Sequence, residues 1–260
     1  MRNSVKKLSA AAAVLTVLSA SSVEAQGNVG LEDVVAIDVL PGWHTEHGTH
    51  MAGIRVRLAP GWKTYWRSPG EGGIPPEFDL AASDNLKSVR AHWPRPEVFD
   101  QNGFRSIGYK DEVVFPLEVT PREAGTPITL RGSLDLGVCQ DVCLPVSVEI
   151  SAGLVDPGAP DPMIREALAN VPDRVNLTVV CRLEPIDDGM QMSARIPVKM
   201  ARGETAVIEL EDRSVWISPS VTERQGDALH ATVDMVPPSG QPFAVDRSTV
   251  RVTILSDGGG

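Results

Sequence analysis

A stretch of alternating apolar and polar residues, LDLGVCQDVCLPVSVEI at residues 134–150, limits most strongly what this chain can fold into. In its first arm, Leu134, Leu136 and Val138 recur at every second position, which is the period of a β-strand with one buried face. The second arm repeats the pattern from Leu144 to Ile150. We therefore predict an antiparallel hairpin with its apolar side chains on one face.

Two cysteines flank the predicted hairpin loop at residues 140–142. Cys139 and Cys143 should face each other across the two strands, on the face away from the core. Opposed residues of an antiparallel pair have Cα atoms roughly 4.5–5.5 Å apart, which is within the range that a disulfide requires. We expect the two sulfurs to bond and to be accessible from solvent.

The disulfide is either a structural staple or a redox centre. Closing so short a loop stabilises a fold by about 2–3 kcal/mol at most in the chain-entropy model. Strained and exposed disulfides are the labile ones, and this favours a redox role. If Asp135 and Asp141 approach the sulfurs, they disfavour a thiolate and make the pair a poor oxidant. The third cysteine, Cys181, lies in an alternating stretch at residues 175–183 and is predicted to be a buried free thiol.

The first residues predict export. Arg2, Lys6 and Lys7 precede an apolar run at residues 8–18 and small residues at 19–25, which is the pattern of a secretory signal peptide with Gln26 as the mature start. No later stretch approaches the roughly 18 apolar residues of a membrane helix. We expect a periplasmic protein without a membrane span, in a compartment where close cysteines oxidise.

The remaining chain is predicted to be all-β. From residue 34 onward, short alternating segments are separated by Gly and Pro, as in β-sandwiches. The composition changes to VDPGAPDP at residues 155–162, where Asp161 can cap a short helix that begins at Pro162. We predict two sandwich domains, at residues 26–155 and 156–260, joined by a short helical connector. A net charge of −10 argues against nucleic acid as a partner.

Other segments have both structural and functional interpretations. Residues 94–109 show neither helical nor strand periodicity and are predicted to be a long loop. The aromatic run at residues 62–66 is interpreted as core, although it could line a groove. A cluster of His44, His47, His50 and Met51 has ligands that suit copper, but only a loop would bring them together, and surface histidines are the alternative. No nucleophile elbow, P-loop or dinucleotide fingerprint is present, and we expect no cofactor.

Four motifs resemble one known family in order and spacing. They are YWRSPGEGGIPPEFD, HWPRP, IGYKDEVVFPLEV and LGVCQDVCLP, and they resemble the N-terminal periplasmic domain of the DsbD/ScsB thiol:disulfide interchange reductases over residues 31–150. A later segment, AVDRSTVRVTIL, is similar to the second sandwich of ScsB-type proteins. The transmembrane and thioredoxin domains of the fuller family members have no counterpart here.

The resemblance implies a fold and a set of roles. Both domains would be immunoglobulin-like, with Cys139 and Cys143 as the exchanging pair and Cys143 as the sulfur that attacks an oxidised partner. An aromatic cap would shield the disulfide, with Phe104 as the best match and Phe99 as a second candidate. Tyr65 and Tyr109 would line the site.

The resemblance also implies partners. A membrane-embedded thiol reductase would supply electrons, and oxidised periplasmic thioredoxin-like proteins would receive them. We therefore expect a stand-alone protein-disulfide reductase-type shuttle. The alternatives are a non-enzymatic binding or assembly domain with a structural disulfide, and a copper-handling protein.

Overall fold

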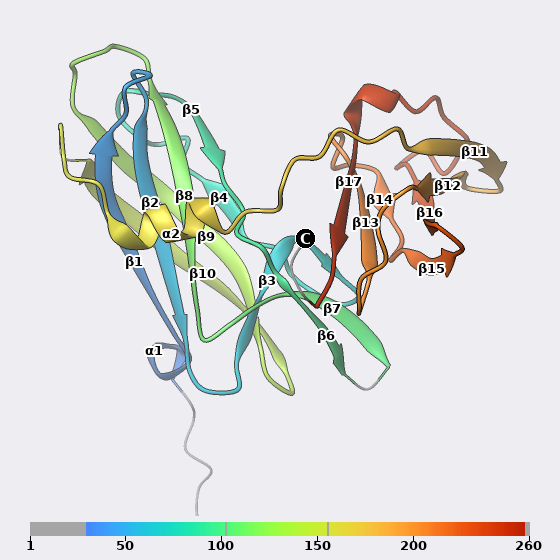
Figure 1. Cartoon of the computed structure of the whole chain (residues 1–260). Helices are drawn as coiled ribbons and strands as arrows, with labels where there is room; N and C mark the ends of the chain where they lie inside the picture. Colours follow the sequence, from blue (N-terminus) through green and yellow to red (C-terminus); the bar gives the residue numbers. More distant parts are fainter. Residues whose placement is uncertain (1–29, 102, 155, 258–260) are drawn as a thin grey trace, which may run out of the picture.

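The computed structural model describes residues 30–101, 103–154 and 156–257. The chain is almost entirely antiparallel β-structure, arranged as two sandwiches that lie side by side (Figure 1). The predicted signal peptide at residues 1–25 falls outside the described residues. Within the described ranges, no helix is long and apolar enough to cross a membrane.

The first sandwich consists of two sheets. One sheet has the strand order β1 (Val35–His44), β2 (His50–Leu58), β8 (Glu112–Pro121) and β5 (Leu86–Ala91), and the short helix α1 (Leu31–Val34) precedes it. The other has the order β10 (Cys143–Leu154), β9 (Ile128–Cys139), β3 (Lys63–Gly70), β7 (Phe104–Lys110) and β6 (Glu97–Gln101), and β4 (Glu77–Asp79) also pairs with β9. The predicted 134–150 hairpin is thus part of a larger sheet.

Large aromatic side chains fill the core between these two sheets. Phe115 contacts the rings of Phe78, Trp93 and Tyr109 with centroids 5.9, 5.3 and 5.5 Å apart. Trp66 is fully buried, as the core interpretation of the aromatic run predicted. Aromatic side chains bury 150–250 Å² each, so this cluster is a major source of the hydrophobic stabilisation.

A short helix, α2 (Pro162–Ala169), follows the first sandwich. As predicted, Asp161 caps it: the carboxylate accepts hydrogen bonds from the backbone N–H groups of Met163 and Ile164 at 2.8 and 3.2 Å. Ile164 and Ala167 are buried against β1, β2 and β8. The connector therefore packs on the first sandwich, and the domain boundary at residues 155–156 stays a prediction.

The second sandwich has a larger and a smaller sheet. The larger has the order β11 (Val180–Ile186), β12 (Gly189–Ile196), β16 (Ala228–Val236) and β14 (Trp216–Ile217), with β15 (Val221–Gln225) also paired to β16. The smaller pairs β13 (Thr205–Leu210) with β17 (Val250–Leu255), which follows the 3-10 turn η1 (Arg247–Thr249). The all-β, immunoglobulin-like fold class is thereby confirmed, with a short helix between the two sandwiches.

The predicted long loop at residues 94–109 is wrong, because most of it forms the β6–β7 hairpin. In β7, Ile107 and Tyr109 point into the core while Ser106 and Gly108 lie on the other face. The sequence hides this alternation because Ser and Gly suggest a turn rather than the outward face of a strand.

The alternating stretch at residues 175–183 is only partly a strand. β11 begins at Val180, and Val175 and Leu177 before it are exposed. Cys181 is a free thiol, as predicted, but it is only partly buried at the edge of the second core. Periodicity identified an apolar segment here, but it did not show that the pairing with β12 begins only at Val180.

A buried ion pair joins the two sandwiches. The Arg67 guanidinium on β3 donates to both carboxylate oxygens of Glu209 on β13 at 2.9 and 2.8 Å, with the two side chains only 8% and 17% exposed. Arg67 also stacks on the Trp66 ring at 3.8 Å. Val207 and Leu255 of the second sandwich extend the core of the first. The same strand that enters the first core therefore anchors the second sandwich.

We expect Arg67→Met to lower the free energy of unfolding by about 3–5 kcal/mol, because it leaves the Glu209 carboxylate without its partner in a mostly buried position. Urea unfolding monitored by Trp fluorescence measures this. Arg195→Met is the matched control: Arg195 pairs with Asp227 on the surface of the second sandwich, so its loss should cost about 1 kcal/mol or less. Equal costs for the two variants would contradict the buried pair as an anchor.

Candidate functional site

The two cysteines form a disulfide at the end of the β9–β10 hairpin. Cys139 is the last residue of β9 and Cys143 the first of β10, and the two are register partners. Their sulfurs are bonded at 2.06 Å. The hairpin, its loop at residues 140–142 and the predicted pairing of the two cysteines are all as the alternation of residues 134–150 indicated.

The two cysteines differ in exposure, and this corrects the expectation that both can be reached. Cys143 is exposed, whereas Cys139 is only 1% exposed. The difference arises because β3 pairs with β9, placing Lys63 opposite Cys139 and Thr64 opposite Val138. The hairpin alone leaves Cys139 on an open face, but the third strand covers it.

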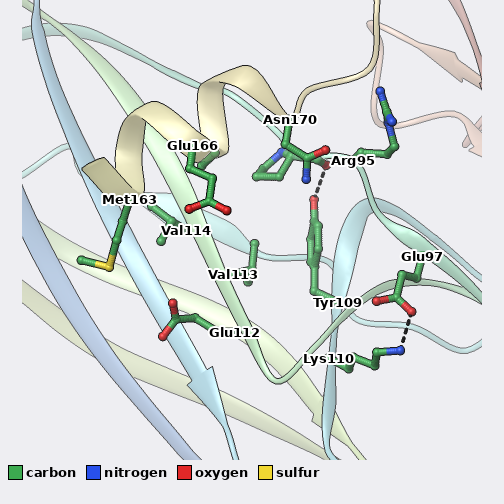
Figure 2. A pocket seen from close by; sticks show the side chains of 12 residues that line it. Arg95, Glu97, Tyr109, Lys110, Glu112, Val113, Val114, Met163, Glu166 and Asn170 are labelled. Atoms are coloured by element: carbon green, nitrogen blue, oxygen red, sulfur yellow. Dashed lines mark hydrogen bonds and ion pairs between the residues drawn. The ribbon is translucent and has the colours of Figure 1, made fainter. Parts of the chain in front are cut away.

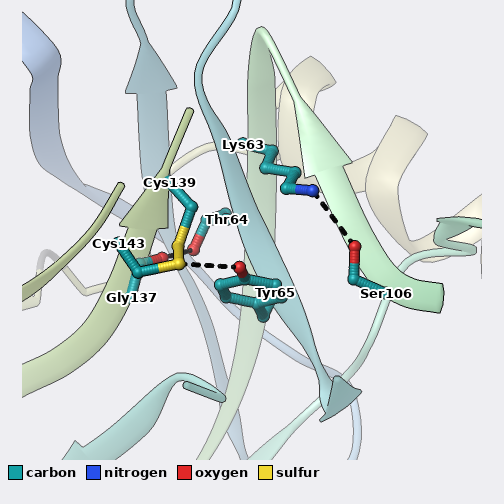
Figure 3. Close-up of a disulfide and its surroundings, with 7 residues drawn as sticks. All are labelled: Lys63, Thr64, Tyr65, Ser106, Gly137, Cys139 and Cys143. Atoms are coloured by element: carbon teal, nitrogen blue, oxygen red, sulfur yellow. Dashed lines mark hydrogen bonds between the residues drawn. A yellow bond between two sulfur atoms is a disulfide. The ribbon is translucent and has the colours of Figure 1, made fainter. Parts of the chain in front are cut away.

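A phenol from β3 contacts the exposed sulfur. The hydroxyl of Tyr65 lies 3.3 Å from Cys143 Sγ (Figure 3). Tyr65 is buried, and burial raises the pKa of its phenol above the usual 10.0. The hydroxyl therefore stays protonated at neutral pH, and it can donate a hydrogen bond to a thiolate at Cys143.

Two glycines make room for the Tyr65 ring beside the disulfide. A Cβ added at Gly137 would come within 3.2 Å of the ring, and one added at Gly73 within 2.7 Å. The loop after β3 covers the ring on that side, and the Gly137 N–H donates to the Ile74 carbonyl at 3.2 Å. The position of the phenol is therefore defined by close backbone approach on both sides.

Lys63 is the residue at this site that sequence analysis missed. Its Nζ lies 3.1 Å from Ser106 Oγ on β7 (Figure 3) and 5.4 Å from the centroid of the Phe99 ring on β6. In the sequence it appears only as a cation within an aromatic run. Its position beside Cys139 depends on the pairing of β3 with β9, which no local pattern indicates.

The two cap candidates lie on the β6–β7 hairpin. Phe104 is 65% exposed at the end of this hairpin, where it is the register partner of Gln101. Phe99 is half-buried, opposite Ser106, and carries the Lys63 ammonium over its ring. Shielding of the disulfide by either phenylalanine stays a prediction.

The structure does not bring Tyr109 together with the cysteines. It pairs with Thr64, on the inner face of the sheet, and its phenol donates to the Pro94 carbonyl at 2.8 Å. Burial raises the pKa of this phenol well above 10.0. Tyr109 instead lines a polar hollow of about 270 Å³ between α2, β8 and residues 94–97, where Lys110 and Glu97 form an ion pair (Figure 2). Neither cysteine lines this hollow.

Asp135 is not close to the sulfurs, contrary to the electrostatic assumption made from the sequence. It lies four residues before Cys139 on β9, which in a strand is about 13 Å. Its carboxylate accepts a hydrogen bond from Ser133. The basis for predicting a poor oxidant is therefore weaker, because the charged residue at the adjacent ladder position is the Lys63 cation.

The histidine cluster does not form a metal centre. His44 and His50 are register partners, but His50 is buried and its Nε2 donates to the Pro41 carbonyl at 2.6 Å. His47 is exposed in the turn between β1 and β2, and Met51 is buried. Over the residues that the structure describes, no group of three or more His, Cys, Asp or Glu side chains could hold a metal ion.

An immunoglobulin-like sandwich that carries a disulfide with one exposed cysteine at a hairpin end is compatible with a thiol:disulfide interchange domain as well as with a structural staple. Residues 33–154 match the family described as "Thiol:disulfide interchange protein DsbD, N-terminal". Over these residues the chain is similar to the DsbD N-terminal domain family.

One solved structure extends the similarity beyond this domain. The crystal structure of the N-terminal periplasmic domain of ScsB from Proteus mirabilis is 26% identical, with a TM-score of 0.60. The match covers 88% of this chain and 95% of that chain, so it includes both sandwiches. No curated protein matches the chain.

We expect the stability of the protein to fall as the pH drops below about 6.5, in part because of His50. Burial lowers the pKa of His50 below its usual 6.5, and neighbouring His44 lowers it further, although the bond to Pro41 opposes both. The unfolded chain therefore takes up this proton first, which costs at most about 1.4 kcal/mol per pH unit between the unfolded and folded pKa values. Urea unfolding across this pH range should show a shallower slope for His50→Gln than for the exposed control His47→Gln. Identical slopes for the two variants would show that His50 does not contribute to this pH dependence.

We expect Tyr65→Phe to raise the thiol pKa of Cys143 by about one unit, because a hydrogen bond to a charged group contributes about 1.5–3 kcal/mol. The measurement is the pH dependence of Cys143 alkylation in a Cys139→Ser/Cys181→Ser background. Tyr109→Phe is the matched control, since its phenol bonds Pro94. An unchanged profile in Tyr65→Phe, or an equal shift in Tyr109→Phe, would exclude the proposed contact with the thiolate.

Proposed function

We propose that this protein is a periplasmic thiol-disulfide shuttle that carries electrons from a membrane-embedded thiol reductase to oxidised thioredoxin-like proteins. The observation that carries the proposal is the asymmetric disulfide, in which Cys143 is exposed beside the Tyr65 hydroxyl and Cys139 is buried. An accessible sulfur can form a mixed disulfide, and a shielded one next to it can resolve that intermediate.

The reaction proceeds in two exchanges. In the reduced protein, the Cys143 thiolate attacks one sulfur of a partner disulfide, which forms a mixed disulfide and releases the other partner sulfur as a thiolate that takes up a proton. The Cys139 thiolate then attacks Cys143 Sγ, so that the Cys139–Cys143 bond forms and the bond to the partner breaks. Two electrons pass to the partner, which leaves as a dithiol.

A staple role explains the geometry less well. β9 and β10 already pair continuously from Cys139–Cys143 to Ile128–Leu154. The disulfide closes a loop of only three residues at the end of this ladder, and so short a loop adds little chain-entropy stabilisation. A bond at this position constrains the unfolded chain only slightly, but it presents a sulfur to solvent.

The surroundings of Cys143 suit a protein partner. Val142 beside it is 68% exposed, and Ile74 and Phe104 are also exposed apolar side chains on the same domain. The family that residues 33–154 match is one of thiol:disulfide interchange proteins, which supports partners that themselves carry cysteine pairs. The periplasmic location is supported by the basic and apolar pattern of residues 1–25 and by the similar periplasmic domain of ScsB.

We expect Cys139→Ser, reduced and mixed with an oxidised periplasmic extract of the source organism, to accumulate mixed disulfides through Cys143, because the resolving thiol is missing. Non-reducing electrophoresis and mass spectrometry detect these adducts. A Cys181→Ser background removes the third thiol.

The matched control is Cys143→Ser in the same background, which should trap at least tenfold less because its remaining sulfur is buried. If Cys139→Ser yields no reductant-sensitive adduct, or if both variants yield the same adducts, the exchange mechanism is excluded. A staple would instead show itself as a large fall in melting temperature when the wild-type disulfide is reduced.

A further inference from the structure

Lys63 occupies the ladder position next to the buried cysteine. Lys63 and Cys139 are register partners across β3 and β9, and Cys139 and Cys143 are partners across β9 and β10. Directly opposed residues of antiparallel strands have their side chains on the same face of the sheet. The ammonium of Lys63 therefore belongs to the face that carries the disulfide.

In the disulfide form, the Lys63 side chain extends toward the β6–β7 hairpin. Its Nζ contacts Ser106 Oγ at 3.1 Å and lies over the Phe99 ring (Figure 3). The residue is half-buried, and partial burial lowers the pKa of its amine below the usual 10.5. Reduction of the disulfide would create a thiolate at the neighbouring ladder position, and an ammonium is stabilised by an adjacent anion.

We propose that Lys63 is a positioning residue of the exchange site that stabilises the Cys139 thiolate once the disulfide has been reduced. The inference rests on the exchange reaction proposed above, in which Cys139 must be a thiolate to attack Cys143 Sγ. A lysine next to a cysteine favours the thiolate, and its four-carbon stem can turn from Ser106 to a new anion one ladder position away.

The other titratable groups around Cys139 do not replace this role. On β3, Tyr65 contacts Cys143, and on β9, Asp135 lies about 13 Å along the strand. Asp141 in the hairpin loop carries the opposite charge and is exposed.

Lys110 on β7 lies one strand further away, opposite Lys63, and is engaged by Glu97. Lys63 is thus the cation that shares a ladder position with Cys139 among the residues that the structure describes.

The test is a titration of Cys139 alone, in a Cys143→Ser/Cys181→Ser background, followed by the ultraviolet absorbance of the thiolate. We expect Lys63→Met to raise the Cys139 thiol pKa by about one unit or more, which is the size of the effect of an adjacent opposite charge. Lys63→Arg should restore a value near that of the parent. Lys110→Met is the matched control, and should leave the pKa unchanged.

A second measurement uses the complete cysteine pair and does not require the single-cysteine variant to fold. Equilibration with glutathione should find the pair of Lys63→Met more reducing than that of the wild type, because the reduced form loses its charge partner, while Lys63→Arg and Lys110→Met stay close to the wild type. An unchanged pKa and potential in Lys63→Met would overturn the proposal, as would an equal shift in Lys110→Met.

Neither measurement involves a partner protein. If Lys63→Met shifts the thiol pKa and the potential as expected but the trapping experiment fails, the shuttle alone is rejected. If trapping succeeds but Lys63→Met shifts neither quantity, the role of Lys63 alone is rejected.

Discussion

The site depends on the pairing of β3 with β9. Two register pairs, Lys63 with Cys139 and Thr64 with Val138, join these strands at the disulfide. The buried hydroxyl of Thr64 donates to the Gly137 carbonyl at 2.8 Å and reinforces this contact from the inner face. Without it, no strand would cover Cys139 at the end of the β9–β10 hairpin. With it, one sulfur is covered and the other is placed at the Tyr65 hydroxyl.

The position of β3 is secured by two adjacent residues in its middle, and this links stability to function. Its middle enters the core through Trp66, and the next residue, Arg67, forms the buried pair with Glu209 of the second sandwich. The second sandwich carries no cysteine at the exchange site, but it holds the strand that supplies Tyr65 and Lys63. Sites that react by close contact need such rigid support, because a small misplacement of the groups around a sulfur changes its reactivity.

The sequence was informative where a physical signal is local. Alternation predicted the hairpin and the cysteine pairing, and the Asp161 cap predicted α2. It failed where the outcome depends on distant strands: the burial of Cys139 and the place of Lys63 both follow from β3, some 70 residues away in the chain. Residues 94–109 failed for another reason, because the small outward residues of β7 hide its period.

The asymmetry of the two sulfurs also resolves a conflict between stability and reactivity. A disulfide exposed on both sides would react with any thiol, and one buried on both sides would react with none. Here Cys143 is exposed, while Cys139 is enclosed between β3 and β10. Because the ladder below the disulfide is continuous, the bond can open without loss of the strands that hold it. In the exchange that we propose, the fold therefore separates the strands that must stay rigid from the single bond that must change.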